Sequence, residues 1–293
     1  MHPVLAILSA LVLAAHGWRK KSLSGSGAIA AATVGFATMV HPDPVFPAVL
    51  IAFYLAGSRV TKVGKRRKAQ IEEEYHEAGN RNAVQVLCNG LTGTLATALH
   101  NYVLVAAADG RISDADATLF DRALTLAVLG HYACCAGDTF ASELGTALAG
   151  WSRAPVLITT WRRVPPGTNG GITPAGTAAS FLGGAVVGAT AAAVAWYAPG
   201  TLWLHAVPAW QLMAMGGAFG LLGSMVDSVL GATLQATWCD PDTKQIRKRA
   251  GNSAVRVAGP AGRWAVLNND AVNFVASLAT AGIAAWVGTR WAR

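Results

Sequence analysis

The sequence LTLAVLGHYACCAGDTFASELGTALAG occupies residues 124–150 and is long enough to cross a membrane. A helix needs about 20 mostly apolar residues to cross the hydrocarbon core of a bilayer. Two carboxylates, Asp138 and Glu143, stand inside this apolar run, and no Lys, Arg or His lies between His131 and Arg153 to pair with them. A charge at membrane depth is costly, so it is retained mainly for function. The stretch therefore predicts both a membrane-spanning helix and a functional site.

The whole chain has the composition of a membrane protein. It has 293 residues, of which 53% are apolar and 13% charged, whereas soluble domains carry roughly 25% charged residues. The formal net charge of +8 does not indicate nucleic-acid binding, because the basic residues cluster between apolar runs as they do in cytoplasmic loops. The composition predicts an integral, multi-pass membrane protein without a nucleic-acid partner.

Apolar runs predict an all-α fold, a polytopic helical bundle with about eight transmembrane helices. The runs lie at about 3–17, 25–41, 44–58, 86–107, 118–149, 174–198, 208–236 and 270–289. Together they form a single membrane domain, residues 1–293. Glycines at helical spacing in the sixth and seventh runs predict close helix packing. The charged segment Gln70–Arg81 predicts a further helix beside the membrane.

The distribution of basic residues predicts how the bundle is oriented. Eight crossings place the loops at about 18–24, 59–85, 150–173 and 237–269 on one side, and these loops hold 19 of the 23 Lys and Arg residues. The positive-inside rule then places the four loops in the cytosol and both termini outside or in a lumen. Tryptophans near the predicted span ends agree with this division, because indoles anchor at the membrane interface.

A third acid, Asp227, lies in a second apolar run, at 221–235. Carboxylate oxygens suit Mg²⁺, which is commonly held by one or two carboxylates together with substrate phosphates. Helical spacing brings Ser142 onto the face of Asp138 and stacks Thr139 toward Glu143. The candidate metal ligands are Asp138, Glu143 and Asp227. The alternative is a structural polar contact between spans.

A Gly-rich loop, LITTWRRVPPGTNGGIT at 157–173, leads into a helix that begins near Pro174. Backbone N–H groups of such a loop can converge on a phosphate, and a helix N-terminus adds positive potential. An arginine supplies a fixed cation for phosphate oxygens. The candidate phosphate-binding residues are Arg163, Gly167, Thr168, Asn169, Gly170 and Gly171. On physical grounds alone, such a loop is more often a simple turn.

Polar residues in the last two spans extend the candidate site. Ser224 and Ser228 share one helical face. Asn269 or Asp270 is expected to cap the last span, whereas Asn273 lies one turn inside the helix, where capping does not explain it.

The basic loop after the third span offers a second cationic candidate. It begins with Arg59 and Lys62, and it continues through Arg81 into the fourth span. Lipid headgroup contact by a polybasic loop and phosphate binding remain equal alternatives for these residues.

Six segments together resemble the transmembrane protein 19 family (DUF92), which includes archaeal and bacterial membrane proteins and the plastid phytyl-phosphate kinase of plants. The segments are GDTFASELG (137–145), LITTWRRVPPGTNGGIT (157–173), GLLGSMVDSVLGATLQ (220–235), NNDAVN (268–273), SRVTK (58–62) and RNAVQVLCNG (81–90). The likeness runs in consistent order over about residues 25–290. Arg163 departs from the Lys that relatives often carry, but it keeps the positive charge.

The resemblance implies a Mg²⁺-dependent kinase that transfers a phosphoryl group from a nucleoside triphosphate, CTP or ATP, to an isoprenoid monophosphate such as phytyl phosphate. In that enzyme the three acids hold Mg²⁺, Arg163 and residues 167–171 hold phosphates, and Asn169, Asn269 and Asn273 orient oxygens or the nucleotide base. The implied partners are the isoprenoid phosphate lipid and membrane lipids, and a homodimer is left open. In a eukaryote the resemblance implies the endoplasmic reticulum or the plastid envelope.

A transporter or scramblase of a phosphorylated lipid is the alternative function. Intramembrane acids and broken helices suit transporters as well. Many transporters contain inverted repeats, and the sequence shows none that is recognisable.

Overall fold

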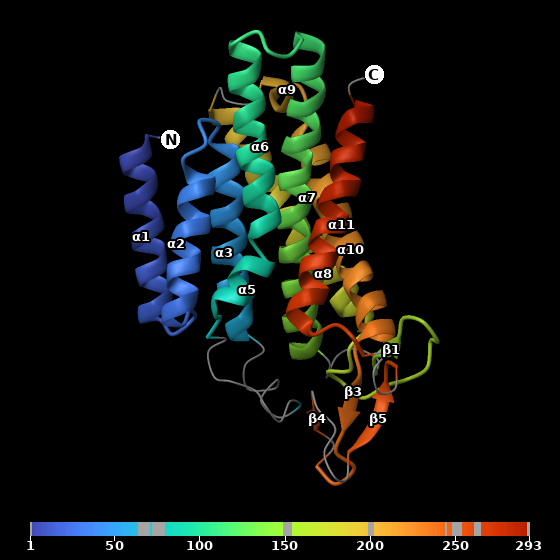
Figure 1. Ribbon diagram of the computed structural model, residues 1–293. Coiled ribbons are helices and arrows are strands. Elements are labelled where there is room, and N and C mark those ends of the chain that lie inside the picture. The colour runs from blue at the N-terminus through green and yellow to red at the C-terminus, as the bar shows by residue number, and fades with distance from the viewer. Residues whose placement is uncertain are drawn as a thin grey trace.

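The structure is a computed structural model that describes residues 2–63, 71, 80–148, 154–198, 202–243, 245–247, 254–260 and 265–291. Within these residues, eight helices of 15 to 34 residues stand side by side in a bundle (Figure 1). They are α1 (Pro3–Arg19), α2 (Gly25–Met39), α3 (Val45–Val63), α6 (Leu91–Ala108), α7 (Asp114–Ala147), α8 (Pro174–Tyr197), α10 (Ala209–Leu234) and α11 (Asn269–Trp291).

Short elements lie in the connections. Two are helices, α5 (Ala83–Cys88) and α9 (Leu202–His205). The strands are β1 (Val156–Leu157), β2 (Gly171–Ile172), β3 (Thr237–Cys239), β4 (Ile246–Arg247) and β5 (Val255–Ala258). β1 pairs antiparallel with β2, and β3 is the middle strand of an antiparallel sheet in the order β4-β3-β5. The all-α prediction holds for the membrane bundle but missed these strands, which are too short to show an alternating pattern.

The eight long helices match the eight predicted spans one for one, so the predicted fold class is confirmed. Five of them, α3, α6, α8, α10 and α11, are long and apolar enough to cross a membrane, and α1 and α2 are shorter apolar helices. The longest helix, α7, has 34 residues and carries Asp138 and Glu143 in its C-terminal half. The helix predicted over residues 70–81 lies almost entirely outside the described residues.

The predicted fourth span, 86–107, is wrong in one respect, because the structure contains two helices there. Asn82 caps α5 with a reciprocal pair of hydrogen bonds: its Oδ1 accepts from the Gln85 N–H (3.0 Å), and Gln85 Oε1 accepts from the Asn82 N–H (3.1 Å). The helix ends at Asn89, whose carbonyl accepts a hydrogen bond from His131 Nε2 on α7 (3.0 Å). The next helix, α6, begins at Leu91, so a hydrogen bond from α7 stabilises the break between α5 and α6.

The central helices α7, α8 and α10 contact one another backbone to backbone. A Cβ atom on Gly137 of α7 would lie 2.5 Å from the carbonyl oxygen of Gly220 on α10, and one on Gly183 of α8 would lie 2.6 Å from that of Ala136 on α7. Helices in lipid associate through such small-residue contacts. The close packing predicted from the glycine spacing is therefore confirmed.

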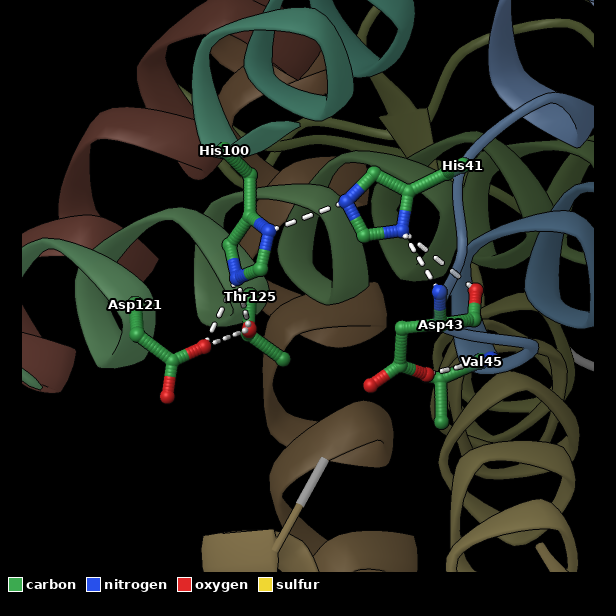
Figure 2. A network of polar contacts seen from close by, with 6 residues as sticks. All are labelled: His41, Asp43, Val45, His100, Asp121 and Thr125. Carbon is green, nitrogen blue, oxygen red and sulfur yellow. Dashed lines mark hydrogen bonds and ion pairs between the residues drawn. The ribbon is translucent and has the colours of Figure 1, made fainter. Parts of the chain in front are cut away.

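A chain of hydrogen bonds fixes the start of α3 and joins it to α6 and α7 (Figure 2). The Asp43 N–H donates to His41 Nδ1 (3.0 Å), and Asp43 Oδ1 accepts from the Val45 N–H (2.8 Å). Because His41 Nδ1 accepts, its Nε2–H donates to His100 Nδ1 (3.0 Å), and His100 Nε2–H then donates to Asp121 Oδ1 (2.7 Å). The two rings are almost completely buried, and neutral tautomers satisfy the whole chain.

Both termini lie at the same end of the bundle (Figure 1), as an even number of crossings requires. The strands and the connection from α7 to α8 lie at the opposite end. Exposed tryptophans mark the ends of several helices. They are Trp18, Trp196, Trp210, Trp286 and Trp291. This placement agrees with interfacial anchoring.

The orientation of the bundle can be tested with two introduced cysteines. Ala115 is exposed at the start of α7, and Asp242 is exposed in the turn between β3 and β4. A membrane-impermeant maleimide added from the cytosolic side should label Asp242→Cys and leave Ala115→Cys unlabelled, because the basic loops are predicted to face the cytosol. The wild-type chain sets the background from its own four cysteines, and equal labelling of both variants from one side would contradict the eight-span topology.

The buried His41 makes stability depend on pH. Burial and the nearby His100 ring lower the pKa of His41 from 6.5 to about 4, so its stabilising contribution is complete above pH 6.5 and decreases as the pH falls toward 4. Between pH 7 and pH 5 the wild type should lose about 2 kcal/mol more unfolding free energy than His41→Gln. Burial raises the pKa of Asp43, which acts in the opposite direction but is common to both proteins. Thermal unfolding in detergent measures the difference, and parallel pH profiles would show that His41 does not titrate on unfolding.

Candidate functional site

A cavity of about 770 Å³ lies between the N-terminal helices and α7. This volume is within the range of roughly 300–1,000 Å³ that is usual for small-molecule sites. Part of its wall is apolar and comes from α1, α2 and α3, with members such as Ala14, Val34 and Leu50. The other part is polar and comes from α5, α7, α11 and the residues before α5. Its members are Asn80, Arg81, Asn82, Gln85, Asn89, Asp138, Thr139, Ser142, Glu143, Asn269, Asp270 and Asn273.

The acidic segment of α7 contributes four polar residues to this wall. Asp138 and Glu143 both line the cavity. The neighbouring hydroxyls also line it, but each is hydrogen-bonded within its own helix: Thr139 Oγ1 donates to the Cys135 carbonyl (2.8 Å), and Ser142 Oγ donates to the Thr139 carbonyl (3.2 Å). The carboxylates are therefore the main charged groups that α7 presents to a ligand.

Arg81 supplies a cation to the same cavity. Its backbone is fixed at the start of α2, because the Arg81 N–H donates to the Ser22 carbonyl (3.1 Å) and its own carbonyl accepts from the Ser24 N–H (3.0 Å). Burial lowers the pKa of Arg81, and the nearby Glu143 carboxylate opposes that shift. In the sequence Arg81 belongs to a polybasic loop, and only the fold shows that it lies near Glu143. The segment RNAVQVLCNG was the signal that could have singled it out.

Asp227 on α10 is joined to the cavity through α11. With its amide nitrogen turned toward both oxygens, Asn273 donates to Asp227 Oδ2 (3.0 Å) and to the Asn269 carbonyl (3.2 Å). Asn273 lines the cavity, and Asp227 lies directly behind it. Asp227 also interacts electrostatically with Asp138 on α7. The structure therefore brings together Asp138, Asp227 and Asn273 from three different helices.

The cap of α11 differs from the prediction. Asn268 takes this position, because its Oδ1 accepts a hydrogen bond from the Ala271 N–H (2.8 Å). Asn269 and Asp270, which the sequence suggested as caps, line the cavity instead. Two asparagines stand next to each other at 268 and 269, and the sequence alone does not show which of them is the N-cap residue.

The donor set suits a hard cation. Among the described residues, no three His, Cys, Asp or Glu side chains group closely enough to hold a metal ion by themselves. Asp138 and Asp227 nevertheless form a pair of interacting carboxylates, and Mg²⁺ commonly takes one or two carboxylates and completes its shell with substrate phosphates and water. Glu143, the third metal ligand that the sequence suggests, lines the same cavity as Asp138 and lies close enough to Arg81 to oppose the lowering of its pKa. Its role as a metal ligand stays a prediction.

The Gly-rich loop packs elsewhere. Gly170 lies against the backbone of Ser228 and Ala232 near the end of α10, and the Asn169 N–H donates to Thr237 Oγ1 on β3 (3.2 Å). The Thr168 hydroxyl donates to the Pro165 carbonyl (2.7 Å) within a tight turn. Gly167 and Gly170 adopt positive φ angles of 87° and 75°, which favour glycine.

None of the loop residues Arg163, Gly167, Thr168, Asn169, Gly170 and Gly171 is among the described residues that line the cavity. Arg163 is exposed. The same holds for Arg59 and Lys62, which are exposed at the end of α3, whereas their neighbour Thr61 does line the cavity. Ser224 and Ser228 also lie outside its wall, and Ser224 is buried inside the bundle. The turn interpretation of the loop therefore agrees with its packing.

The fold and this cavity define a polytopic membrane protein with a partly apolar, partly charged internal site. The chain belongs to the family described as integral membrane protein DUF92, whose model matches residues 8–281. It is 35% identical to Protein PGR of Arabidopsis thaliana over 94% of this chain and 93% of that protein. It is 26% identical to an uncharacterized membrane protein of Methanocaldococcus jannaschii over 94% of this chain and 89% of that one. No solved structure matches it. The family predicted from the six segments is confirmed.

The position of Arg81 can be tested through Gly27. A Cβ atom at Gly27 would collide with the Arg81 carbonyl oxygen, whereas Gly25, two residues earlier in the same helix, has open space around it. Gly27→Ala should lower the unfolding free energy by about 1–3 kcal/mol through this clash, and Gly25→Ala should leave it unchanged or slightly raise it. Thermal unfolding of both variants measures the effect. Equal stability of the two would mean that Arg81 is not fixed against α2.

Proposed function

We propose that this protein is a Mg²⁺-dependent kinase that transfers a phosphoryl group from a nucleoside triphosphate, CTP or ATP, to an isoprenoid monophosphate. The observation that carries the proposal is the cavity, which joins an apolar wall from α1 to α3 with a charged wall from α7 and α11. A lipid monophosphate has the same two parts. Membership of the DUF92 family also supports the proposal, because the resemblance described above includes the phytyl-phosphate kinase of plants.

The charged wall would bind the phosphate of the lipid. Arg81 offers a planar guanidinium, which forms paired hydrogen bonds with phosphate oxygens. The amide side chains of Asn82 and Asn269 line the same space and can donate to further oxygens. The acceptor is already an anionic phosphate, so the reaction needs no strong general base.

The reaction is a single displacement. An oxygen of the lipid monophosphate forms a new bond to the γ-phosphorus of the nucleotide, and the bond from that phosphorus to the β,γ-bridging oxygen breaks. The products are the lipid diphosphate and a nucleoside diphosphate. Such transfers depend mainly on an in-line arrangement and on neutralisation of charge.

Asp138 and Asp227 would hold the Mg²⁺ ion, and Asn273 would keep the Asp227 carboxylate in place. When bound, Mg²⁺ neutralises charge on the transferring phosphates. Glu143 would orient Arg81, because the two side chains interact in the cavity.

The test is a phosphoryl-transfer assay on purified protein with labelled CTP or ATP, Mg²⁺ and prenyl monophosphates. Asp138→Asn should reduce turnover to background without unfolding the protein, since it removes a metal-binding charge and little volume. Arg81→Ala should reduce kcat/KM by about ten- to a hundredfold, because a charge-assisted contact to phosphate contributes roughly 1.5–3 kcal/mol.

Arg163→Ala is the matched control, since Arg163 is an arginine of the same end of the bundle that does not line the cavity. It should retain most of the activity. A larger loss in Arg163→Ala than in Arg81→Ala would move phosphate binding to the Gly-rich loop. Absence of transfer with both nucleotides, combined with movement of a prenyl phosphate across vesicles, would favour the transporter alternative.

A further inference from the structure

The apolar part of the cavity is lined by α1, α2 and α3, and it is called the channel below. Its wall there combines large apolar side chains with several small ones. Ala10 and Ala14 contribute from α1, and Ala31, Gly35 and Met39 contribute from α2. A Cβ atom added at Gly35 would lie 3.4 Å from the methyl carbon of Ala10, which is an ordinary van der Waals distance, so the two helices leave room there for a methyl group.

The length of the channel follows from α3. Thr61 near the charged end and Leu50 near the far end both line it. Eleven residues of α-helix separate them, which corresponds to about 16 Å. The channel therefore extends over several isoprene units rather than one.

The far end of the channel is closed by Met39. This side chain is 1% exposed and packs with Ala6 and Ala10 in an apolar cluster that also includes Leu50 and Ile51. Methionine is flexible and adapts to irregular gaps, so it can end a channel without a rigid wall. No charged residue is among the described residues of this end.

The outer wall of the channel is α1. Among the described elements, α1 packs extensively only against α2, although its residues face the same cavity as those of α3. Much of the opposite face of α1 is exposed and apolar, including Leu8, Leu11 and Val12. This helix therefore separates the channel from the surrounding lipid.

We propose that this channel binds the isoprenoid chain of the lipid, and that Ala31 and Met39 set the longest chain that fits. The proposal rests on the proposed function for the charged end, because the monophosphate must lie near Arg81 for its chain to enter between α2 and α3. A side chain larger than Ala31 would narrow the channel partway along, and one smaller than Met39 would lengthen it.

The test compares Ala31→Leu, Met39→Ala and the control Ala32→Leu with the wild type. Ala32 is the adjacent half-buried alanine of α2 and does not line the cavity. Binding of geranyl, farnesyl and phytyl monophosphates is measured by native mass spectrometry without nucleotide, and turnover is measured separately. Ala31→Leu should weaken phytyl monophosphate relative to geranyl monophosphate at least tenfold. Met39→Ala should shift the preference toward longer chains, and Ala32→Leu should keep the wild-type preference.

Each outcome separates this proposal from the kinase assignment. An unchanged chain-length preference in both Ala31→Leu and Met39→Ala would overturn the channel even if transfer is observed. An equal change in Ala31→Leu and Ala32→Leu would overturn it as well, because the effect would then be a general disturbance of α2. The predicted shifts in binding, without any transfer in the wild type, would support the channel and reject the kinase.

Discussion

The arrangement of the charged cavity depends on the contact between α7 and α10 through Gly137 and Gly220. A side chain at Gly137 would collide with the Gly220 backbone, so the two helices approach as closely as their main chains allow. Asp138 follows Gly137 directly, and Asp227 lies two turns beyond Gly220, on a related face of its helix. Helices gain no hydrophobic driving force from one another in lipid, and close packing is what holds them together. That packing must also offset the repulsion between the two carboxylates it brings near each other.

The molecule has two parts with different packing, and the cavity lies where they meet. The helices α7, α8, α10 and α11 pack extensively against one another. The helix α1 packs mainly against α2, and both contribute small apolar residues to the channel. α3 belongs to both, since it packs against α7 and lines the channel. The histidine chain at its start holds α3 to α6 and α7 (Figure 2), which fixes one wall of the cavity relative to the acids.

The length and order of the spans could be predicted because each depends on a local run of apolar residues. The break between α5 and α6 could not, because it depends on a contact between Asn89 and His131, which are 42 residues apart. The acids of α7 were found from their cost in lipid, which is a property of the segment alone. The Gly-rich loop looked equally suitable for phosphate. Its packing against α10 and β3 depends on tertiary contacts, which the local sequence does not show.

Arg81 is a residue that the sequence did not single out and the fold did. In sequence it is one of many basic residues near a cytosolic loop. Its position in the cavity wall depends on two backbone hydrogen bonds to residues 22 and 24, far away in the chain. Charge counting predicts on which side of the membrane such a residue lies, and it carries no information on which single arginine meets a carboxylate.

The charge balance of the cavity favours a ligand role over a structural one. Arg81 and Glu143 offset each other, whereas Asp138 and Asp227 interact as like charges. Charges interact more strongly in a partly buried site than in water, so a phosphate near these acids would be repelled unless a cation came with it. A divalent cation would attract both the acids and the phosphate, and it would replace their mutual repulsion with attraction to the shared ion. A purely structural contact between α7 and α10 would be more stable with neutral side chains in place of the acids. A cation and an anionic headgroup bound together in the cavity would make the pair favourable, as the proposed transfer to a lipid monophosphate requires.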